Sequence, residues 1–100
     1  LTIRSYHGVG DDDTPLAQSL GKPIIVEEAG FATSDGDRPS LLQGDLNLWF
    51  NRGVAGYMQW GFMATPTDNG DGDGVFGMDH ALHDDWTGLF DTYQSYAASL

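Results

Sequence analysis

Two adjacent carboxylates, Glu27 and Glu28, end an apolar run that begins at Ile24. A continuous run of β-branched residues predicts a strand that is buried on both faces, as in a parallel sheet. Ligands of parallel α/β sheets bind at the carboxyl ends of the strands, where a carboxylate can contact a ligand and exchange protons with it. Period-two alternation places Glu28 on the same side as Val26 and Ile24, and Glu27 on the other side, but alternation alone does not say which side faces a site. Two solvated surface acids are the alternative interpretation.

A second group of acidic side chains lies in a long Gly/Asp-rich loop, residues 65–77. Asn69, Asp71 and Asp73 alternate and are followed by Gly74, which matches the first half of an EF-hand-like Ca²⁺ loop. His80 stands where such a loop has a bidentate Glu, and no helix precedes it, so a full EF-hand is excluded. The sequence requires no cofactor, and it predicts a looser candidate Ca²⁺ site at Asp68, Asn69, Asp71 and Asp73. A solvated, turn-rich loop is the alternative.

Strands and helices that could position these groups alternate along the chain. Strands are expected at Thr2–Tyr6, Ile24–Glu28 and Val54–Trp60, and helices at Pro15–Leu20, from Pro39 to Arg52 and after Asp84 or Asp85. Residues 7–10 are expected to break the first strand. Strand–helix alternation implies parallel strands with right-handed crossovers, and therefore an α/β fold in one domain, residues 1–100.

Two predicted helices carry apolar side chains at helical spacing, which predicts their buried faces. Aromatic residues in these stripes are interpreted as packing residues. The stripes consist of Leu42, Leu46, Trp49 and Phe50 in one helix and Trp86, Leu89, Phe90, Tyr93 and Ala97 in the other. Three parallel strands leave both sheet edges open and need cover on both faces, so we expect another chain, a second copy or further sequence to complete the sheet.

The charge balance excludes several classes of protein. Fifteen acidic residues against four basic ones give a formal charge of −11, and the chain has no cysteine. Four cations cannot form the basic surface that nucleic acids or an anionic membrane require. No apolar run approaches the roughly 20 residues of a membrane span. The chain starts at Leu1 without a charged-then-apolar leader, so we expect a processed product or a segment of a longer protein.

The segment Lys22–Phe31, KPIIVEEAGF, followed by Gly56–Gly61, GYMQWG, resembles strands seven and eight of a clan A glycoside hydrolase. The resemblance is closest to family-five-like TIM barrels of the β-mannanase or cellulase type, and it covers essentially the whole chain. It implies that Glu28 is the catalytic nucleophile and that Trp60 stacks on the sugar. Thr2–His7 is similar to strand six of that family, which often carries a His-x-Tyr motif.

Three further residues are candidate substrate contacts because they lie near the expected strand ends. His7 is placed to hydrogen-bond the nucleophile or a sugar hydroxyl, with a histidine satisfied by backbone at a strand end as the alternative. Tyr6 and Phe31 lie near strand ends and could line the cleft, or they could simply pack. Val9 stands where the family has the tyrosine that hydrogen-bonds the nucleophile, and Tyr6 is not expected to replace it because it is one residue off the inward register.

The family's acid/base lies in an Asn-Glu-Pro-like segment after strand four, and this sequence contains none. Retaining hydrolysis needs two carboxyl groups roughly 5–5.5 Å apart. The resemblance therefore implies the last three βα units of a (β/α)8 TIM barrel. Strands one to five and the acid/base Glu are expected in a second polypeptide, with a removed part of the same chain as the alternative.

The expected function is that of a retaining β-glycoside hydrolase on mannan- or glucan-type polysaccharide, secreted because such enzymes meet polymers outside the cell. A non-catalytic carbohydrate-binding or assembly module, and a small Ca²⁺-stabilised α/β domain, are the alternatives.

Overall fold

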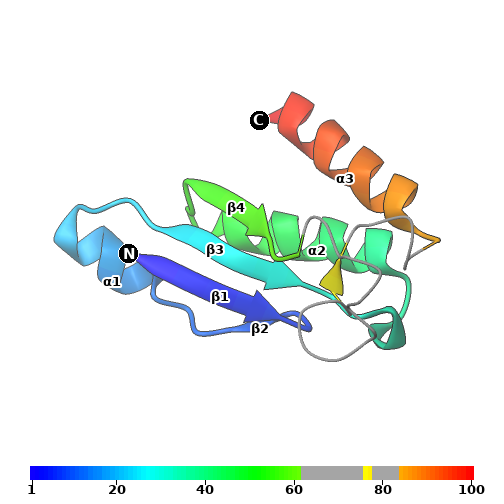
Figure 1. The fold of residues 1–100 in the computed structure, drawn as a ribbon. Coiled ribbons are helices and arrows are strands. Elements are labelled where there is room, and N and C mark those ends of the chain that lie inside the picture. The colour runs from blue at the N-terminus through cyan, green and yellow to red at the C-terminus, as the bar shows by residue number, and fades with distance from the viewer. Residues whose placement is uncertain (62–75, 78–83) are drawn as a thin grey trace.

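The protein, described by a computed structural model at residues 1–61, 76–77 and 84–100, has a mixed four-stranded sheet in the order β2-β1-β3-β4 (Figure 1). The three strands β1, β3 and β4 are parallel, as predicted, and β2 is antiparallel to β1. The elements are β1 (Thr2–Tyr6), β2 (Val9–Gly10), α1 (Thr14–Leu20), β3 (Ile25–Gly30), the short 3-10 turn η1 (Thr33–Asp35), α2 (Arg38–Asn51), β4 (Gly56–Gln59) and α3 (Trp86–Ser99).

The short strand β2 is the main departure from the predicted topology. Residues 7–10 end β1 as expected, but the chain then turns back and pairs with it. His7 and Gly8 both have positive φ, 55° and 75°, which is the backbone geometry of a tight hairpin turn. Tyr6 pairs with Val9 and Ser5 with Gly10. A two-residue strand is too short to show a period in the sequence.

Local sequence signals explain where the helices begin and end. Pro15 and Pro39 lie in the first turns of α1 and α2, where the backbone N–H has no helical partner to lose. Gly21 ends α1 in the left-handed conformation, with φ 62°, a conformation that costs glycine little. Asp85 is the N-cap residue of α3, in agreement with one of the two predicted caps.

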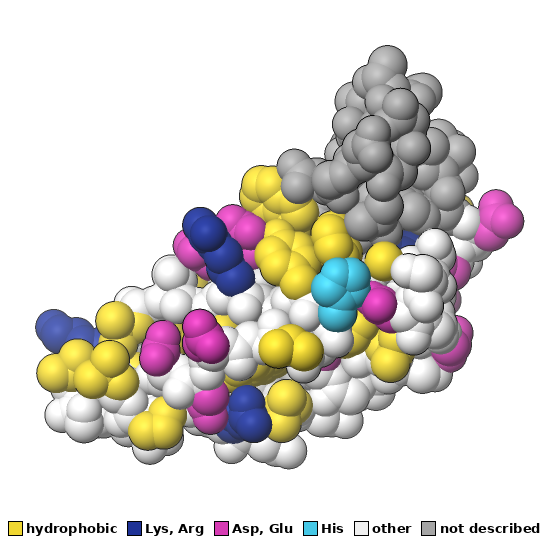
Figure 2. Space-filling model, turned by 90° about the horizontal axis from the view of Figure 1, so that it is seen from below, with side chains coloured by type: hydrophobic (Ala, Val, Ile, Leu, Met, Phe, Trp, Pro, Cys, Tyr) yellow, Lys and Arg dark blue, Asp and Glu magenta, His cyan; other side chains and the backbone are white. Residues whose placement is uncertain are grey.

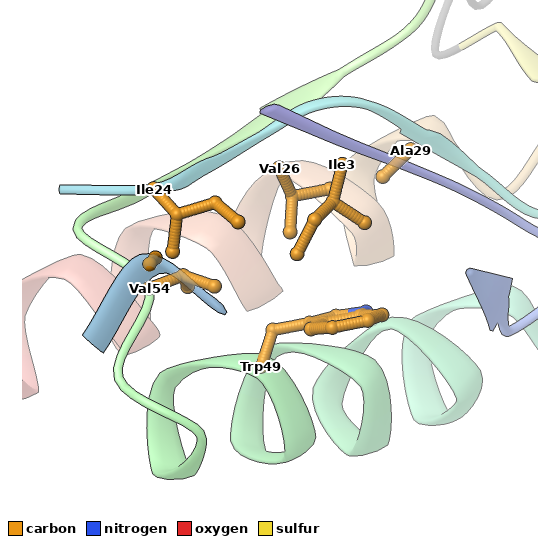
Figure 3. Close-up of a cluster of buried hydrophobic side chains, with 7 residues drawn as sticks. Ile3, Ile24, Val26, Ala29, Trp49 and Val54 are labelled. Atoms are coloured by element: carbon orange, nitrogen blue, oxygen red, sulfur yellow. The ribbon is translucent and has the colours of Figure 1, made fainter. Parts of the chain in front are cut away.

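The core lies between the sheet and the helices α1 and α2. Figure 3 shows Ile3, Ile24, Val26 and Ala29 pointing from the sheet toward Trp49 of α2, with Val54 beside them. Ala17 of α1 belongs to the same buried cluster. Each of these side chains is less than about one-tenth exposed, so α1 and α2 cover the same face of the sheet.

Helix α3 packs on α2 and also contacts β4, where the Tyr93 hydroxyl donates to Gln59 at 2.8 Å. Leu89 is buried against Leu42 and Leu46, which confirms the centres of both predicted apolar stripes. The stripe predicted for α3 is wrong at three of its five positions, because Trp86 and Phe90 are each more than a third exposed and Ala97 is exposed as well.

Within the described ranges the helices leave the other face of the sheet uncovered. Arg4 and Tyr6 of β1 and Met58 of β4 point to that face, because Ile3, Ser5 and Tyr57 between or beside them point to the helices. Arg4 and Met58 are exposed and Tyr6 is partly exposed. We call this surface the open face. None of the helices in the described ranges combines the length and apolarity that crossing a bilayer requires.

Candidate functional site

A β-bulge in β3 determines where the two glutamates point. Ile3 of β1 pairs with Val26, but the next residue of β1, Arg4, pairs with Glu28, so Glu27 is the extra residue. The pairing of β3 with β4 shifts along the same stretch. A bulge places two residues opposite one and displaces the alternation by one position beyond it.

The displaced alternation corrects the face that period two predicts for Glu28. Val26 and Ala29 are both fully buried on the helix face although they are three residues apart. Glu28 consequently lies on the open face, opposite to Val26 and Ile24, and the sequence-based placement of these three residues on one side is wrong. The physical reason is the bulge, which no hydrophobic pattern records.

The carboxylate of Glu28 has two close partners on the open face. The Tyr6 hydroxyl donates to Oε2 at 2.7 Å, and Arg4 Nε lies 3.3 Å from Oε1. Arg4 Nε also lies 3.5 Å from Oε1 of Glu27, so one guanidinium serves both glutamates. The Glu28 side chain is 22% exposed, enough for contact with a ligand. The expectation that Tyr6 is out of register with Glu28 is wrong, because Tyr6 shares the face of Arg4.

His7 lies beside this pair at the same end of the sheet. Its Nδ1 is 2.6 Å from Oδ2 of Asp35, and its ring meets the ring of Phe76 edge-on with centroids 5.2 Å apart. Phe76 also contacts the Tyr6 ring at 4.8 Å. Figure 2 shows a histidine beside an acidic side chain and, on the same surface, a basic side chain with acidic side chains next to it. Asp35 is a site residue that sequence reasoning missed, because its partner is 28 positions away.

Trp60 and Phe31, both predicted to bind substrate, differ in accessibility. Trp60 directly follows β4, its backbone N–H donates to Ala29 at 2.8 Å, and its side chain is 37% exposed. Phe31 is 7% exposed, and a Cβ on Gly8 would lie 3.3 Å from its ring. The packing alternative is therefore favoured for Phe31, whereas Trp60 has a free surface for a ligand.

A buried arginine holds the ends of several elements around the site. Arg38 is 1% exposed and forms a two-pronged pair with Asp85, Nε to Oδ2 at 2.8 Å and NH2 to Oδ1 at 2.5 Å. Its NH1 group donates to the carbonyls of Phe31, Phe76 and Gly77 at 3.1, 3.3 and 3.0 Å. Arg38 thus ties the segment after β3 to residues 76–77 and to the start of α3. The sequence gives no local signal for this role.

A buried carboxylate, Asp45, links α2 to the sheet on the helix face. It accepts hydrogen bonds from Tyr57 at 2.6 Å and from Ser5 at 3.4 Å, and Trp49 Nε1 donates to Ser5 at 3.2 Å. Burial raises the pKa of Asp45, an effect that these hydrogen bonds offset only in part. Burial likewise raises the pKa values of Tyr57 and Tyr93 far above their ordinary value. All three groups face away from Glu28.

The predicted Ca²⁺ ligands Asp68, Asn69, Asp71 and Asp73 lie outside the described residues. Within the ranges that the structure does describe, no group of three or more His, Cys, Asp or Glu side chains is arranged to hold a metal ion. The calcium site stays a prediction.

Compared with protein-family models, with curated proteins and with solved structures, the chain gives no significant match. The chemistry of the site is therefore that of its own residues: a carboxylate on the open face with a tyrosine and an arginine as partners, an exposed indole directly after the neighbouring strand β4, and an imidazole paired with a carboxylate.

Proposed function

We propose that this chain supplies the nucleophile half of a retaining β-glycoside hydrolase acting on mannan- or glucan-type polysaccharide, completed by a second polypeptide. The observation that carries the proposal is the placement of Glu28 on the open face, hydrogen-bonded to Tyr6 at 2.7 Å. A nucleophilic carboxylate must be accessible and fixed in direction. The Glu28 side chain is 22% exposed, and contacts from Tyr6 and Arg4 to its two oxygens fix its direction.

In the proposed reaction, an oxygen of Glu28 attacks the anomeric carbon while the leaving alcohol takes a proton from the acid/base of the second polypeptide. The resulting glycosyl ester is hydrolysed by water, which the same acid/base deprotonates. Trp60, which is 37% exposed beyond β4, offers an apolar ring to the C–H face of a pyranose. Hydrolysis of a polymer favours secretion, which is part of the proposal.

The uncovered surface supports the need for a second polypeptide. Parallel sheets are normally covered on both faces, and within the described ranges the helices cover one. The sequence contains no Asn-Glu pair that could match the acid/base segment of the family it resembles. A polypeptide that adds strands would close the open face around Glu28 and bring the missing carboxyl group to it.

An activated substrate tests the nucleophile without the acid/base. A dinitrophenyl glycoside with fluorine next to the anomeric carbon needs no proton donor, because dinitrophenolate leaves unaided. We expect one fluoroglycosyl group to attach to the chain as one dinitrophenolate is released, and peptide mass mapping to locate the ester at Glu28. Both gluco- and manno-configured reagents should be used, and the preferred one indicates the polysaccharide class.

Two variants make the labelling experiment specific. Glu28→Gln removes the nucleophile and should abolish labelling, whereas Glu27→Gln, the adjacent glutamate at the bulge, should label like the wild type. Labelling that persists in Glu28→Gln, or its absence from the folded wild-type chain, contradicts the proposal.

The second candidate is a carbohydrate-binding or assembly module. Its support is the exposed Trp60 together with the missing Asn-Glu pair, because a module that binds sugar needs the ring but no acid/base. Binding of cellotetraose or mannotetraose without any labelling of Glu28 would favour it.

A further inference from the structure

The contact between His7 and Asp35 determines which nitrogen of the imidazole carries the proton. His7 Nδ1 lies 2.6 Å from Oδ2 of Asp35, and the two side chains are 51% and 24% exposed. An ionised carboxylate accepts hydrogen bonds and cannot donate, so the proton of this contact belongs to Nδ1. In the neutral imidazole the other nitrogen, Nε2, then carries a lone pair and no hydrogen.

Asp35 is fixed independently of His7. Its Oδ2 also accepts the backbone N–H of Ala32 at 2.8 Å, and its own N–H donates to the Ala32 carbonyl at 2.9 Å. Burial acts to raise the pKa of Asp35, but the hydrogen bonds from His7 and Ala32 outweigh it and lower the pKa below the ordinary value. The carboxylate is therefore ionised in the folded chain, and its contacts with Ala32 fix its direction without the help of His7.

The backbone also fixes His7. It has φ 55° in the turn between β1 and β2, and its N–H donates to the Gly30 carbonyl of β3 at 2.9 Å. Its ring lies against Phe76, the same ring that contacts Tyr6, the partner of Glu28. Two turns that follow adjacent parallel strands thus meet at His7 and Asp35, and Phe76 connects them to Tyr6, the partner of the proposed nucleophile.

We propose that Asp35 is a positioning residue that holds His7 as the Nδ1–H tautomer and so presents Nε2 as an acceptor to a hydroxyl of the bound sugar. This proposal rests on the proposed function for its ligand, but its structural part, the tautomer, does not. Sugar hydroxyls donate readily, and an acceptor fixed in direction selects a hydroxyl of one orientation. The competing explanation is that the contact between His7 and Asp35 only links the two turns and has no role in binding.

Nitrogen NMR of the imidazole tests the tautomer directly, because the protonated and unprotonated nitrogens resonate far apart. We expect wild-type His7 to be protonated at Nδ1 at a pH where it is neutral. Asp35→Ala should lose this preference, and Asp35→Asn should keep it, because the amide oxygen can still accept from Nδ1. Asp37→Ala is the matched control, since Asp37 lies two residues further along and its carboxylate accepts from Ser40.

Titration with cellotetraose and mannotetraose, read by calorimetry and by the Nε2 resonance, tests the ligand. Asp35→Ala should bind the preferred oligosaccharide about fivefold to tenfold more weakly, the worth of one hydrogen bond, whereas Asp37→Ala should bind like the wild type. Sugar should shift Nε2 in the wild type and in Asp35→Asn. Thermal unfolding checks that every variant is folded.

The outcomes separate the two proposals. Protonation of wild-type His7 at Nε2, or a tautomer unchanged in Asp35→Ala, overturns the positioning role whatever the chain binds. If folded Asp35→Ala binds sugar with unchanged affinity, the role in binding is refuted, and the contact between His7 and Asp35 only links the two turns. If the wild type binds neither oligosaccharide, the substrate class is wrong and the sugar contact is withdrawn with it.

Discussion

Replacing Arg38 by Met is the most stringent test of how the site end of the molecule is held together. The variant keeps an unbranched apolar stem in place of the aliphatic part of the side chain but removes the donors to Asp85 and to three backbone carbonyls. Breaking a buried ion pair costs about 3–5 kcal/mol because the partner stays charged. The Asp85 side chain is 31% exposed and can recover water, so the expected loss is near the lower limit, about 3 kcal/mol.

In a domain of this size, 1 kcal/mol lowers the melting temperature by roughly 4–8 °C, so Arg38→Met should lower it by about 12–24 °C. Circular dichroism during heating measures the shift. Arg38→Lys should show most of the same loss of stability as Arg38→Met, because a single ammonium cannot replace the planar, two-pronged guanidinium.

Arg52→Met is the matched control, since Arg52 lies 3.5 Å from Asp12 at the surface and 4.9 Å above the Trp49 ring. Such contacts are worth about 1 kcal/mol, so its shift should be clearly smaller. Equal shifts for Arg38→Met and Arg52→Met would refute the reasoning, because they would mean that burial of the Arg38 pair has no energetic consequence.

Three other predictions follow from single side chains. Because the pKa of Asp45 is raised in the folded state, its contribution to stability is complete below its ordinary value of 3.8 and is lost as the pH rises through the folded-state value. In urea unfolding, Asp45→Asn should therefore gain stability relative to the wild type as the pH rises above that value, and the opposite trend would contradict the raised pKa. Gly44→Ala should stabilise α2 by up to about 1 kcal/mol, because nothing lies within 4 Å of the new Cβ, whereas Gly88→Ala should not stabilise, because its Cβ would lie 2.8 Å from a proline carbon of α2. Tyr6→Phe should slow labelling of Glu28 by the activated glycoside about tenfold without moving the label, and an unchanged rate would show that the hydroxyl does not assist.

Much of the fold could be predicted because short-range chemistry determines it. The strand Thr2–Tyr6 has its predicted bounds, α1 and α2 start one residue before the predicted prolines, and Gly21 ends α1 as a left-handed residue should. Period-two and helical patterns identify elements reliably when one face is buried. The sequence does not predict β2, because a strand of two residues with an exposed valine is too short to show such a pattern.

The candidate site was predictable in its residue types but not in its geometry. The position of Glu28 at a strand end follows from the apolar run before it, whereas its face depends on a bulge that only the pairing with β1 and β4 reveals. The partners Tyr6 and Asp35 come from segments 22 residues before Glu28 and 28 residues after His7. Contacts across such separations are set by the register of the sheet and by turn conformation, neither of which a linear pattern contains.

The hairpin strand β2, Val9–Gly10, makes the two edges of the sheet unequal. Its pairing occupies the outer hydrogen-bonding groups of β1 near the carboxyl end, and a Cβ on Gly10 would lie 2.9 Å from the Arg4 carbonyl oxygen, so the return fits tightly there. At the β1 edge, a strand of another chain can therefore pair only with the amino half of β1. Within the described ranges, no strand covers the β4 edge in this way. Copies of the chain are thereby hindered from pairing edge to edge into a filament. A complementary polypeptide has one preferred edge, that of β4, at which to begin pairing.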